Sequence, residues 1–320
     1  MYAVTALSPR SAVPAFWPFW ALLLLVAHGL LLLFLHARPG AIAVVPFLAG
    51  PPVLAALTAV TVILAGHDVL YGGWRRLVRL RLLFDALVLA ASIFILLFAY
   101  RTYPSSHDTT VVGPCLAVPL AGDVAVLHGG RTVDVNRHAG SPSRRYAYDL
   151  AIVRDDAVHE GTGDALDDYY TYAAPVLAPM AGVVVSTRDG VPDRQPSRSA
   201  WRPWFDVNGN YVVIEVDDGR YLLLSHLQPG SIRVRPGDDI AVGMPVAKAG
   251  NSGRSATPHL QLHVQDSPVT NGGEGVPVEF CDYDAIARGA SWDTARHIDR
   301  GMPTGRGRPQ VIRRTAPTAP

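Results

Sequence analysis

Before residue 101 the chain contains long apolar stretches without a charged side chain, and no other feature limits its fold as strongly. Residues 16–36 and 41–66 contain no Lys, Arg, Asp or Glu, and residues 82–100 carry one acid, Asp85. About 20 apolar residues are enough for a helix to cross the hydrocarbon core of a bilayer. Helices of soluble proteins rarely run this far without a charge. We therefore expect residues 1–100 to be a transmembrane region with three spans.

Basic residues in the loop between the second and third spans predict how this region is oriented. Four arginines lie there, at positions 75, 76, 79 and 81. The positive-inside rule places this loop and the N-terminus in the cytoplasm, and everything after Tyr100 outside. The first span lacks a clear cleavage site, so we interpret it as an anchor rather than a signal peptide. The expected protein is a multi-pass component of the cell membrane, in contact with the lipid bilayer.

The remainder of the chain has the pattern of a β protein. Residues 101–112 are expected to be a polar linker, and residues 113–300 contain short β runs separated by Gly, Pro and Asp turns. In "NYVVIEVDDGRYLLLSHL" two alternating runs flank "DDG", which is a hairpin signal. These patterns predict an all-β domain of antiparallel sheets, barrel-like or sandwich. Residues 301–320, rich in Pro, Arg and Thr, are expected to be a disordered tail.

Two further properties bear on environment and partners. The cysteines, Cys115 and Cys281, both lie in the predicted outer part, where an oxidising compartment permits a disulfide. Two buried free thiols are the alternative. The net charge of +1 gives no indication of a nucleic-acid partner, and we expect none.

Residues 256–266, "ATPHLQLHVQD", carry the clearest chemical signal. His259, Gln261 and His263 alternate with apolar residues, so they lie on one face of a predicted strand. Two residues four apart on a strand are about 13 Å apart, too far for both histidines to bind one ion easily. The helical zinc motif H-E-x-x-H is absent from the sequence.

Other candidate ligands lie upstream. His138 and His226 are in ordered-looking segments, and Asp149 is a lone carboxylate in an apolar strand. Such a carboxylate must be paired, hydrogen-bonded or bound to a metal. Imidazole nitrogens and a carboxylate oxygen are the ligands of catalytic zinc sites. His128 and His159 have loop-like surroundings, for which we favour surface roles over ligation.

Several phrases occur in the order found in a known family. They are "NRHAGSPSRRYAYDLAI", "PVLAPMAGVVV", "GNYVVIEVDDGRYLLLSHLQPG" with the turn that follows it, and "TPHLQLHVQDSP". Over roughly residues 120–285 the chain resembles the lysostaphin-type (LytM-like) zinc metallopeptidases, which cut peptide bonds in bacterial peptidoglycan. An ordered series of motifs is more specific than any one of them.

The resemblance implies roles for particular residues. His138 and Asp149 would be zinc ligands, and His226 and His259 would be catalytic. The third ligand of the family is a histidine, and Gln261 stands at that position. A neutral amide oxygen is a much poorer zinc ligand than imidazole.

Three outcomes for the third ligand remain open. Gln261 binds weakly, or His259 or His263 takes over, or zinc binds poorly. His263 shares the face but lies about 6–7 Å further along the strand. Its alternative role is that of a hydrogen-bonded strand residue.

Three functional hypotheses follow. The first is a membrane-anchored, zinc-dependent endopeptidase whose substrate is the peptide of peptidoglycan. The second is a degenerate domain that binds cell wall or regulates another hydrolase through a protein partner, and Gln261 motivates it. The third, from "VRPGDDIAVGMPVAKAGNSG", is a lipoyl or biotinyl carrier with Lys248 as the attachment site. That fold needs only about 80 residues and has no use for four histidines around an acid, so we disfavour it.

Overall fold

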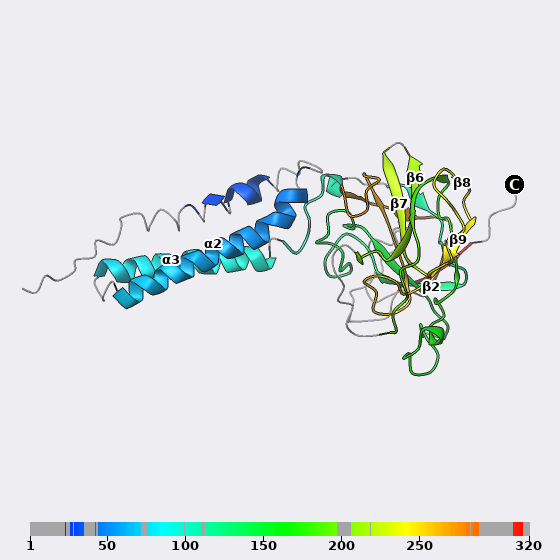
Figure 1. Ribbon diagram of the computed structural model, residues 1–320, viewed down its shortest axis with the longest axis horizontal. Coiled ribbons are helices and arrows are strands. Elements are labelled where there is room, and N and C mark those ends of the chain that lie inside the picture. Colours follow the sequence, from blue (N-terminus) through cyan, green and yellow to red (C-terminus); the bar gives the residue numbers. More distant parts are fainter. Residues whose placement is uncertain are drawn as a thin grey trace, which may run out of the picture. The chain divides into compact units, whose positions relative to one another are not determined.

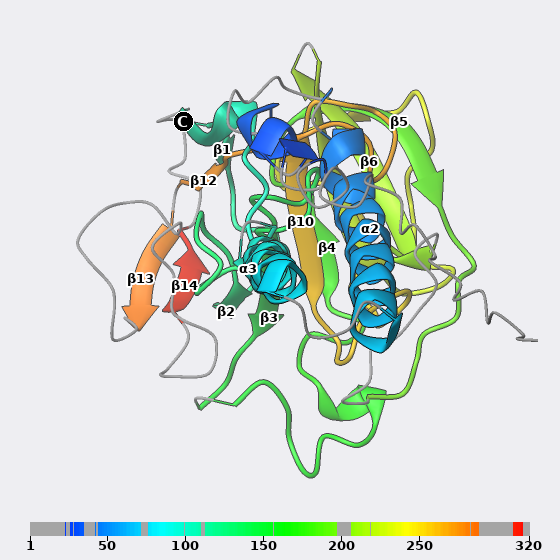
Figure 2. The ribbon, with the colours of Figure 1, turned by 90° about the vertical axis from the view of Figure 1, so that its left-hand side faces the viewer.

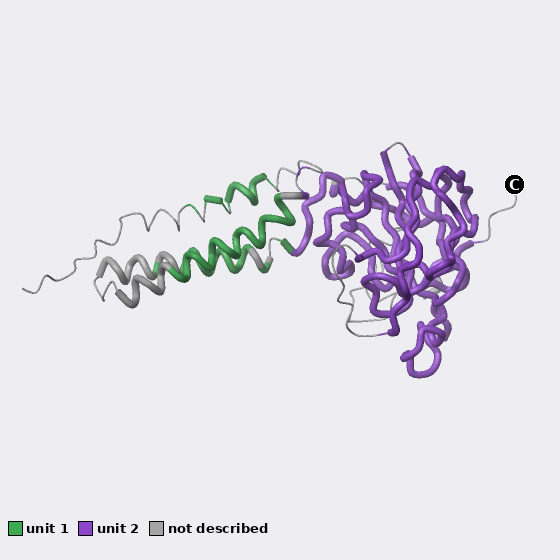
Figure 3. The backbone as a smooth tube through the Cα atoms, in the orientation of Figure 1, with its two compact units in different colours: residues 1–37, 45–100 green, residues 38–44, 101–320 purple. Residues whose placement is uncertain are grey.

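The computed structural model divides the chain into two compact units, which Figure 3 shows in different colours. The first comprises residues 1–37 and 45–100, and the second comprises residues 38–44 and 101–320. The structure describes residues 23, 26, 27, 29–34, 42, 44–71, 76–98, 100–109, 113–155, 157–196, 206–217, 219–281, 283–287 and 310–315.

The first unit contains two long helices, α2 (Val44–Tyr71) and α3 (Arg76–Phe98). One described helix is long and apolar enough to cross a membrane, with its apolar window at Pro46–Ile63. Helix α3 contributes a shorter apolar stretch, Ala86–Ile95. The described residues therefore supply one candidate span instead of the predicted three. The first predicted span, residues 16–36, lies largely outside the described residues.

The second unit is built on a large sheet, so the prediction of a β domain with antiparallel sheets is confirmed (Figure 1). Its strand order is β13-β14-β2-β3-β10-β7-β6-β5-β8, with β11 also paired to β10. The bounds are β2 Asp123–His128, β3 Tyr148–Ile152, β5 Gly182–Arg188, β6 Asn210–Asp217, β7 Arg220–Leu227, β8 Asp239–Ile240, β10 Leu260–Gln265, β11 Gly275–Val276, β13 Tyr283–Ala287 and β14 Gln310–Arg314. Figure 2 shows β2, β3 and β10 side by side, with β13 and β14 beyond β2.

Smaller elements complete this unit. Two further sheets each have two strands, β1 with β12 in parallel and β4 with β9 antiparallel. Their bounds, with those of the short 3-10 helices, are β1 Cys115–Leu116, β12 Glu279–Phe280, β4 Pro175–Leu177, β9 Pro245–Lys248, η2 Ser106–Thr109 and η3 Leu166–Asp168. Cys115 and Cys281 form a disulfide next to the β1–β12 pair, so the bridged alternative holds.

One face of the large sheet packs on the hydrophobic core, and this fixes which residues lie on the other. In β10 the apolar residues Leu260, Leu262 and Val264 are fully buried in that core. Side chains alternate between the two faces of a strand, so Gln261 and His263 point to the opposite face. The alternation seen in the sequence therefore distinguishes the core-facing residues of β10 from the polar residues on its other face.

Turn chemistry also follows the sequence. Strands β6 and β7 form the predicted hairpin, and Gly219 in its turn has a φ of 72°. This left-handed conformation carries little cost for glycine, which explains the "DDG" signal.

The prediction of a disordered tail is wrong for part of the C-terminal segment. Residues 310–314 form β14, which pairs with both β2 and β13. Val311 and Ile312 are buried, with exposed fractions of 5% and 0%. The segment "QVIRR" contains two β-branched apolar residues, a strand signal that the Pro- and Arg-rich flanks concealed.

Candidate metal and catalytic centre

Four polar side chains form a row across neighbouring strands of the large sheet. His128 of β2 lies opposite Asp149 of β3, which lies opposite Gln261 of β10. Gln261 lies opposite Ser225 of β7. Residues directly opposite each other in antiparallel strands share a face, so these four, here called the cross-strand row, are neighbours on the face away from the core.

The loop between β2 and β3 adds His138 to this row. Asn136, which is fully buried, accepts the backbone N–H of His138 at 2.8 Å and donates to the carbonyl of Gly130 at 2.7 Å. The His138 Nε2 atom lies 3.0 Å and 3.1 Å from the two carboxylate oxygens of Asp149. It also lies 3.2 Å from the amide nitrogen of Gln261. His138, Asp149 and Gln261 therefore converge at one point.

Asp149 is the centre of charge in this arrangement. It is 0% exposed, and the Arg137 guanidinium lies 2.7 Å from its Oδ2 atom. His259 Nε2 is 3.7 Å from its Oδ1 atom. Burial raises the pKa of Asp149, but His138, His259 and Arg137 outweigh burial and hold that pKa well below its usual value. The carboxyl group is thus an anion, and it is available as a ligand.

His226 and His259 form a pair beside these ligands, with ring centroids 4.9 Å apart. His226 has a φ of 63°, at a register shift between β7 and β6. Such a bulge redirects a side chain, and bulges are common beside active sites. The bulge therefore explains how a residue next to Ser225 on the same strand reaches His259.

Backbone carbonyls determine which ring nitrogen of each histidine carries a proton. His226 Nδ1–H donates to the carbonyl of Ser252, and His259 Nδ1–H donates to that of Thr257, both at 2.8 Å. The Nε2 atom of each neutral ring is then a proton acceptor. Burial lowers the pKa of His226 to about 3, and burial also lowers the pKa of His259. Both rings are therefore neutral bases near pH 7.

The donor set fits a divalent metal ion. Among the described residues, four buried polar atoms of the centre have no hydrogen-bond partner: Gln261 Oε1, Ser225 Oγ, His259 Nε2 and His128 Nδ1. Buried polar atoms are rarely left unsatisfied, and all four have a lone pair to offer. A half-turn of the Gln261 amide exchanges its oxygen and nitrogen, which brings the oxygen to the His138–Asp149 pair. One imidazole, one carboxylate and one amide oxygen are suitable, though unequal, ligands for zinc.

His263, the other candidate ligand, lies apart from this point. Its Nε2 atom is 3.1 Å from Gln265 Oε1, and burial lowers its pKa to about 3. No hydrogen bond or ion pair joins it to His138 or Asp149 within the described part of the chain. The geometry matches the alternative stated for it, a hydrogen-bonded residue of the strand.

His128 lies in a strand, whereas loop-like surroundings were expected for it, and its side chain is partly buried. It ends β2 within the cross-strand row, and its ring centroid lies 6.2 Å from that of His138. The signal that identifies it is register: "DVAVLH" is an alternating strand whose last residue pairs with Asp149. Sequence alone does not give strand pairing between segments this far apart.

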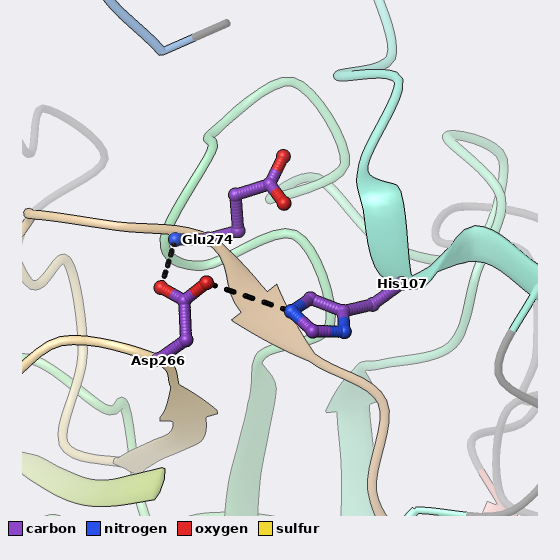
Figure 4. Close-up of side chains that lie close together, drawn as sticks. All are labelled: His107, Asp266 and Glu274. Carbon is purple, nitrogen blue, oxygen red and sulfur yellow. Dashed lines mark hydrogen bonds and ion pairs between the residues drawn. The ribbon is translucent and has the colours of Figure 1, made fainter. Parts of the chain in front are cut away.

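A second cluster of titratable side chains contains His107, Asp266 and Glu274, each with one ligand-type atom within 4.8 Å of the others (Figure 4). Glu274 is fully buried, and its carboxylate already accepts hydrogen bonds from the hydroxyls of Tyr103 and Ser106. His107 Nε2 lies 3.5 Å from Asp266 Oδ2. Because protein donors occupy Glu274, we interpret the cluster as a clamp that holds residues 103–107 against the connection between β10 and β11.

The same segment is bonded to the loop that carries His138. The backbone N–H of Tyr103 donates to the carbonyl of Ala139 at 2.8 Å, and Arg145 Nε donates to the carbonyl of Tyr103 at 2.9 Å. Tyr103 is 0% exposed. The prediction of a polar linker is therefore wrong for this segment, because its one large aromatic side chain is buried.

The ion pair of the clamp should make stability depend on pH. The hydrogen bond to Asp266 raises the pKa of His107, and that contribution to stability is lost as the pH rises through the raised value. Burial raises the pKa of Asp266, but its bonds to His107 and to the Glu274 backbone lower it overall. Its contribution is lost as the pH falls through the lowered value.

We therefore expect Asp266→Asn to lower the melting temperature most between about pH 4 and pH 6.5, the usual pKa values of the two groups. The difference from the unmodified protein should shrink towards pH 8. Melting curves at several pH values measure this, with Asp217→Asn, at an exposed ion pair with Arg220, as the matched control. A difference that does not vary with pH would contradict the role of the ion pair.

Part of the second unit is similar to a family of peptidases. The model that matches is that of Peptidase family M23, over residues 164–275. This range contains His226, His259 and Gln261, whereas His138 and Asp149 lie before it. The match confirms the metallopeptidase resemblance at the level of the family for these residues. No curated protein matches the chain.

Solved structures that match parts of the chain include an M23 protein. A mutant catalytic domain of the prophage-encoded M23 protein EnpA from Enterococcus faecalis is 18% identical, covering 52% of this chain and 93% of that chain (TM-score 0.32). The catalytic domain of lysostaphin from Staphylococcus simulans is 16% identical, covering 48% and 86% (TM-score 0.27). A zinc containing peptidase from Vibrio cholerae is 19% identical, covering 51% and 39% (TM-score 0.30).

Proposed function

We propose that the protein is a zinc-dependent endopeptidase that hydrolyses peptide bonds of bacterial peptidoglycan. The observation that carries the proposal is the His138–Asp149 pair beside two buried acceptors, Gln261 Oε1 and His259 Nε2, that have no partner within the described part of the chain. A cation at this point would satisfy the acceptors and stabilise the buried carboxylate. The M23 match over residues 164–275 supports a peptidase rather than a storage or transport site.

The site residues divide into ligands and bases. His138, Asp149 and the oxygen of Gln261 would hold the zinc ion. When bound, zinc polarises a substrate carbonyl and lowers the pKa of a water molecule that attacks it. The Arg137 guanidinium lies against Asp149 Oδ2, so it would have to move away from this oxygen when zinc binds there.

The two remaining histidines are suited to handle protons. Their Nδ1–H groups are fixed on backbone carbonyls, so each Nε2 atom accepts a proton in a defined direction. His259 lies nearer to Asp149 and is the better placed general base. His226, 4.9 Å away between ring centroids, presents a second neutral Nε2 acceptor beside His259.

The cellular setting is part of the proposal. Helix α2 contains an apolar window, Pro46–Ile63, of a length that crosses a bilayer. Four arginines follow it, Arg75 and, at the start of α3, Arg76, Arg79 and Arg81, and they support a cytoplasmic location for this end of the two helices. An anchor in the cell membrane would then hold the second unit outside, where peptidoglycan lies. The disulfide between Cys115 and Cys281 supports an oxidising compartment.

A second candidate function is a degenerate domain that binds cell wall, or regulates another hydrolase, without cutting. Two observations favour it. Gln261 replaces an imidazole, and Arg137 already gives Asp149 a cationic partner at 2.7 Å. A domain of this kind would keep the fold but would not need zinc.

Metal analysis separates the two candidates. The full-length protein, purified in detergent and exposed to excess zinc, is expected to retain about one zinc ion per chain. It is also expected to release peptide fragments from muropeptides in a reaction that a chelator stops. A folded protein that retains no zinc and cuts nothing, yet sediments with purified cell wall, would establish the degenerate function instead.

A further inference from the structure

We propose that Tyr103 is a positioning residue of the metal centre, which holds the loop of His138 where that histidine can share an ion with Asp149. The inference rests on the proposed zinc site and deepens it. It concerns a residue outside residues 164–275, the range matched by the family model. Tyr103 would act through the backbone of the residue that follows His138.

His138 differs from the other two proposed ligands in what holds it in place. Asp149 and Gln261 lie on β3 and β10 and are paired with each other in the sheet. His138 lies in the connection between β2 and β3, residues 129–147, all of which the structure describes as turns, bends or irregular chain. A side chain on such a connection is placed less precisely than one on a strand, unless other contacts hold its backbone.

Bonds within this connection give the turn at His138 its shape. The Oδ1 atom of Asn136 accepts the N–H of His138 at 2.8 Å, and the Asn136 carbonyl accepts the N–H of Ala139 at 3.1 Å. Further along the connection, the carbonyl of Pro142 accepts the N–H of Gly275 in β11 at 2.8 Å. The placement of the turn therefore depends on what holds it next to His138.

Tyr103 holds the turn at that place. Its backbone N–H donates to the carbonyl of Ala139, the residue after His138, at 2.8 Å. Its own carbonyl accepts the Nε–H of Arg145, near the end of the same connection, at 2.9 Å. One residue from a distant part of the sequence thus bonds the connection on both sides of the turn. Residues that orient a metal ligand in this way commonly change metal affinity when they are replaced.

The position of Tyr103 is itself fixed from several directions. Its ring is 0% exposed, and its hydroxyl donates to Glu274 Oε1 at 2.5 Å. Arg145, which donates to its carbonyl, is also bonded to the carbonyl of Arg131 at 2.6 Å and to the Asp108 carboxylate at 3.2 Å. A buried ring with a bonded hydroxyl and two bonded backbone groups is a rigid support for the His138 loop.

The zinc affinity of the full-length protein tests the assignment without relying on catalysis. We expect Tyr103→Ala to lower the affinity, measured by competition with a chromogenic chelator, by more than about 10-fold. With Co²⁺ in place of zinc, the visible absorption spectrum should also change, because it depends on the geometry of the ligands. Tyr103→Phe keeps the ring and both backbone bonds and loses one hydrogen bond, so its affinity should stay within about 3-fold.

Tyr169→Ala is the matched control. Tyr169 belongs to the same unit, is 9% exposed, and donates its hydroxyl to the carbonyl of Gly163 at 3.0 Å. Both alanine variants therefore lose a buried ring and one hydroxyl bond, and both should have a lower melting temperature. Only Tyr103→Ala should bind zinc more weakly. If Tyr103→Ala does not fold, Tyr103→Leu and Tyr169→Leu give the same comparison with a smaller loss of buried volume.

Hydrogen exchange of the zinc-free protein is a second readout. In Tyr103→Ala the amides of His138 and Ala139 should exchange more than about 10-fold faster, because the turn opens locally, while that of Leu262 in β10 should change little. A zinc affinity no lower than that of Tyr169→Ala, or unchanged exchange at Ala139, would overturn the assignment while leaving the proposed function in place. If the folded, unmodified protein binds no zinc, the proposed function fails, and exchange at Ala139 still decides whether Tyr103 holds the loop.

Discussion

Replacing Asp149 with asparagine is expected to abolish zinc binding and all chelator-sensitive cleavage by this protein. The affinity for zinc should fall by more than about 100-fold, beyond the effect typical of residues that only support ligands. The carboxylate is 0% exposed and provides the only negative charge among the described residues that contact the centre. Without it, the ion would be surrounded by neutral donors and the Arg137 cation, with no charge to offset its desolvation.

Asparagine preserves the shape of the side chain, so the fold should survive the change. Asp149 is held within the sheet by backbone pairing to β2 and β10, which the substitution leaves in place. Zinc titration and muropeptide cleavage would be measured together with a melting curve. Asp217→Asn, at an exposed ion pair, serves as the control. Retained zinc in folded Asp149→Asn would show that the metal lies elsewhere.

The strands that carry the site were predictable because burial imposes a period of two. In β10, alternate residues enter the core, so "HLQLHV" identifies both the strand and its polar face. Asp149 was predictable for a similar reason, since a carboxylate within an apolar strand must have a partner. Residue type made His138, Asp149, His226 and His259 candidates, and the family resemblance predicted that they act together.

Pairing between distant segments was not predictable from these patterns. His128 enters the site only because β2 pairs with β3 in a particular register, and that register includes a bulge. His226 reaches His259 through a positive φ, which no residue pattern announces. The strand at residues 310–314 likewise depends on the edge that β2 offers to it. Each is a tertiary effect that overrides local propensity.

The clamp is a second case in which contacts between distant segments could not be predicted, here between charged residues. His107, Asp266 and Glu274 are far apart in the sequence, and a polar segment such as "RTYPSSHDT" has the composition of a linker. Its attachment depends on one buried aromatic residue, Tyr103, and on a buried acceptor, Glu274. The polar composition of this segment therefore conceals the two residues, Tyr103 and Glu274, that determine whether it is attached to the domain.

Gln261→His should have the opposite effect to Asp149→Asn and raise zinc affinity by about 100-fold, or about 2.7 kcal/mol. Position 261 lies between Asp149 and Ser225 across the sheet, within 3.2 Å of His138 Nε2, so an imidazole there reaches the same point. Ser225 Oγ is buried and has no hydrogen-bond partner among the residues that the structure describes, so it is available to accept the second ring N–H and orient the new ligand.

The outcome of Gln261→His tests whether the residue at position 261 limits the affinity for zinc. Cleavage of muropeptides should rise with zinc occupancy when zinc is scarce, and change little when zinc is saturating. His263→Gln is the control, since His263 bonds Gln265 away from the centre. An unchanged affinity in Gln261→His would mean that position 261 does not face the metal, which would contradict the register of β10 with β3 as the basis of the site.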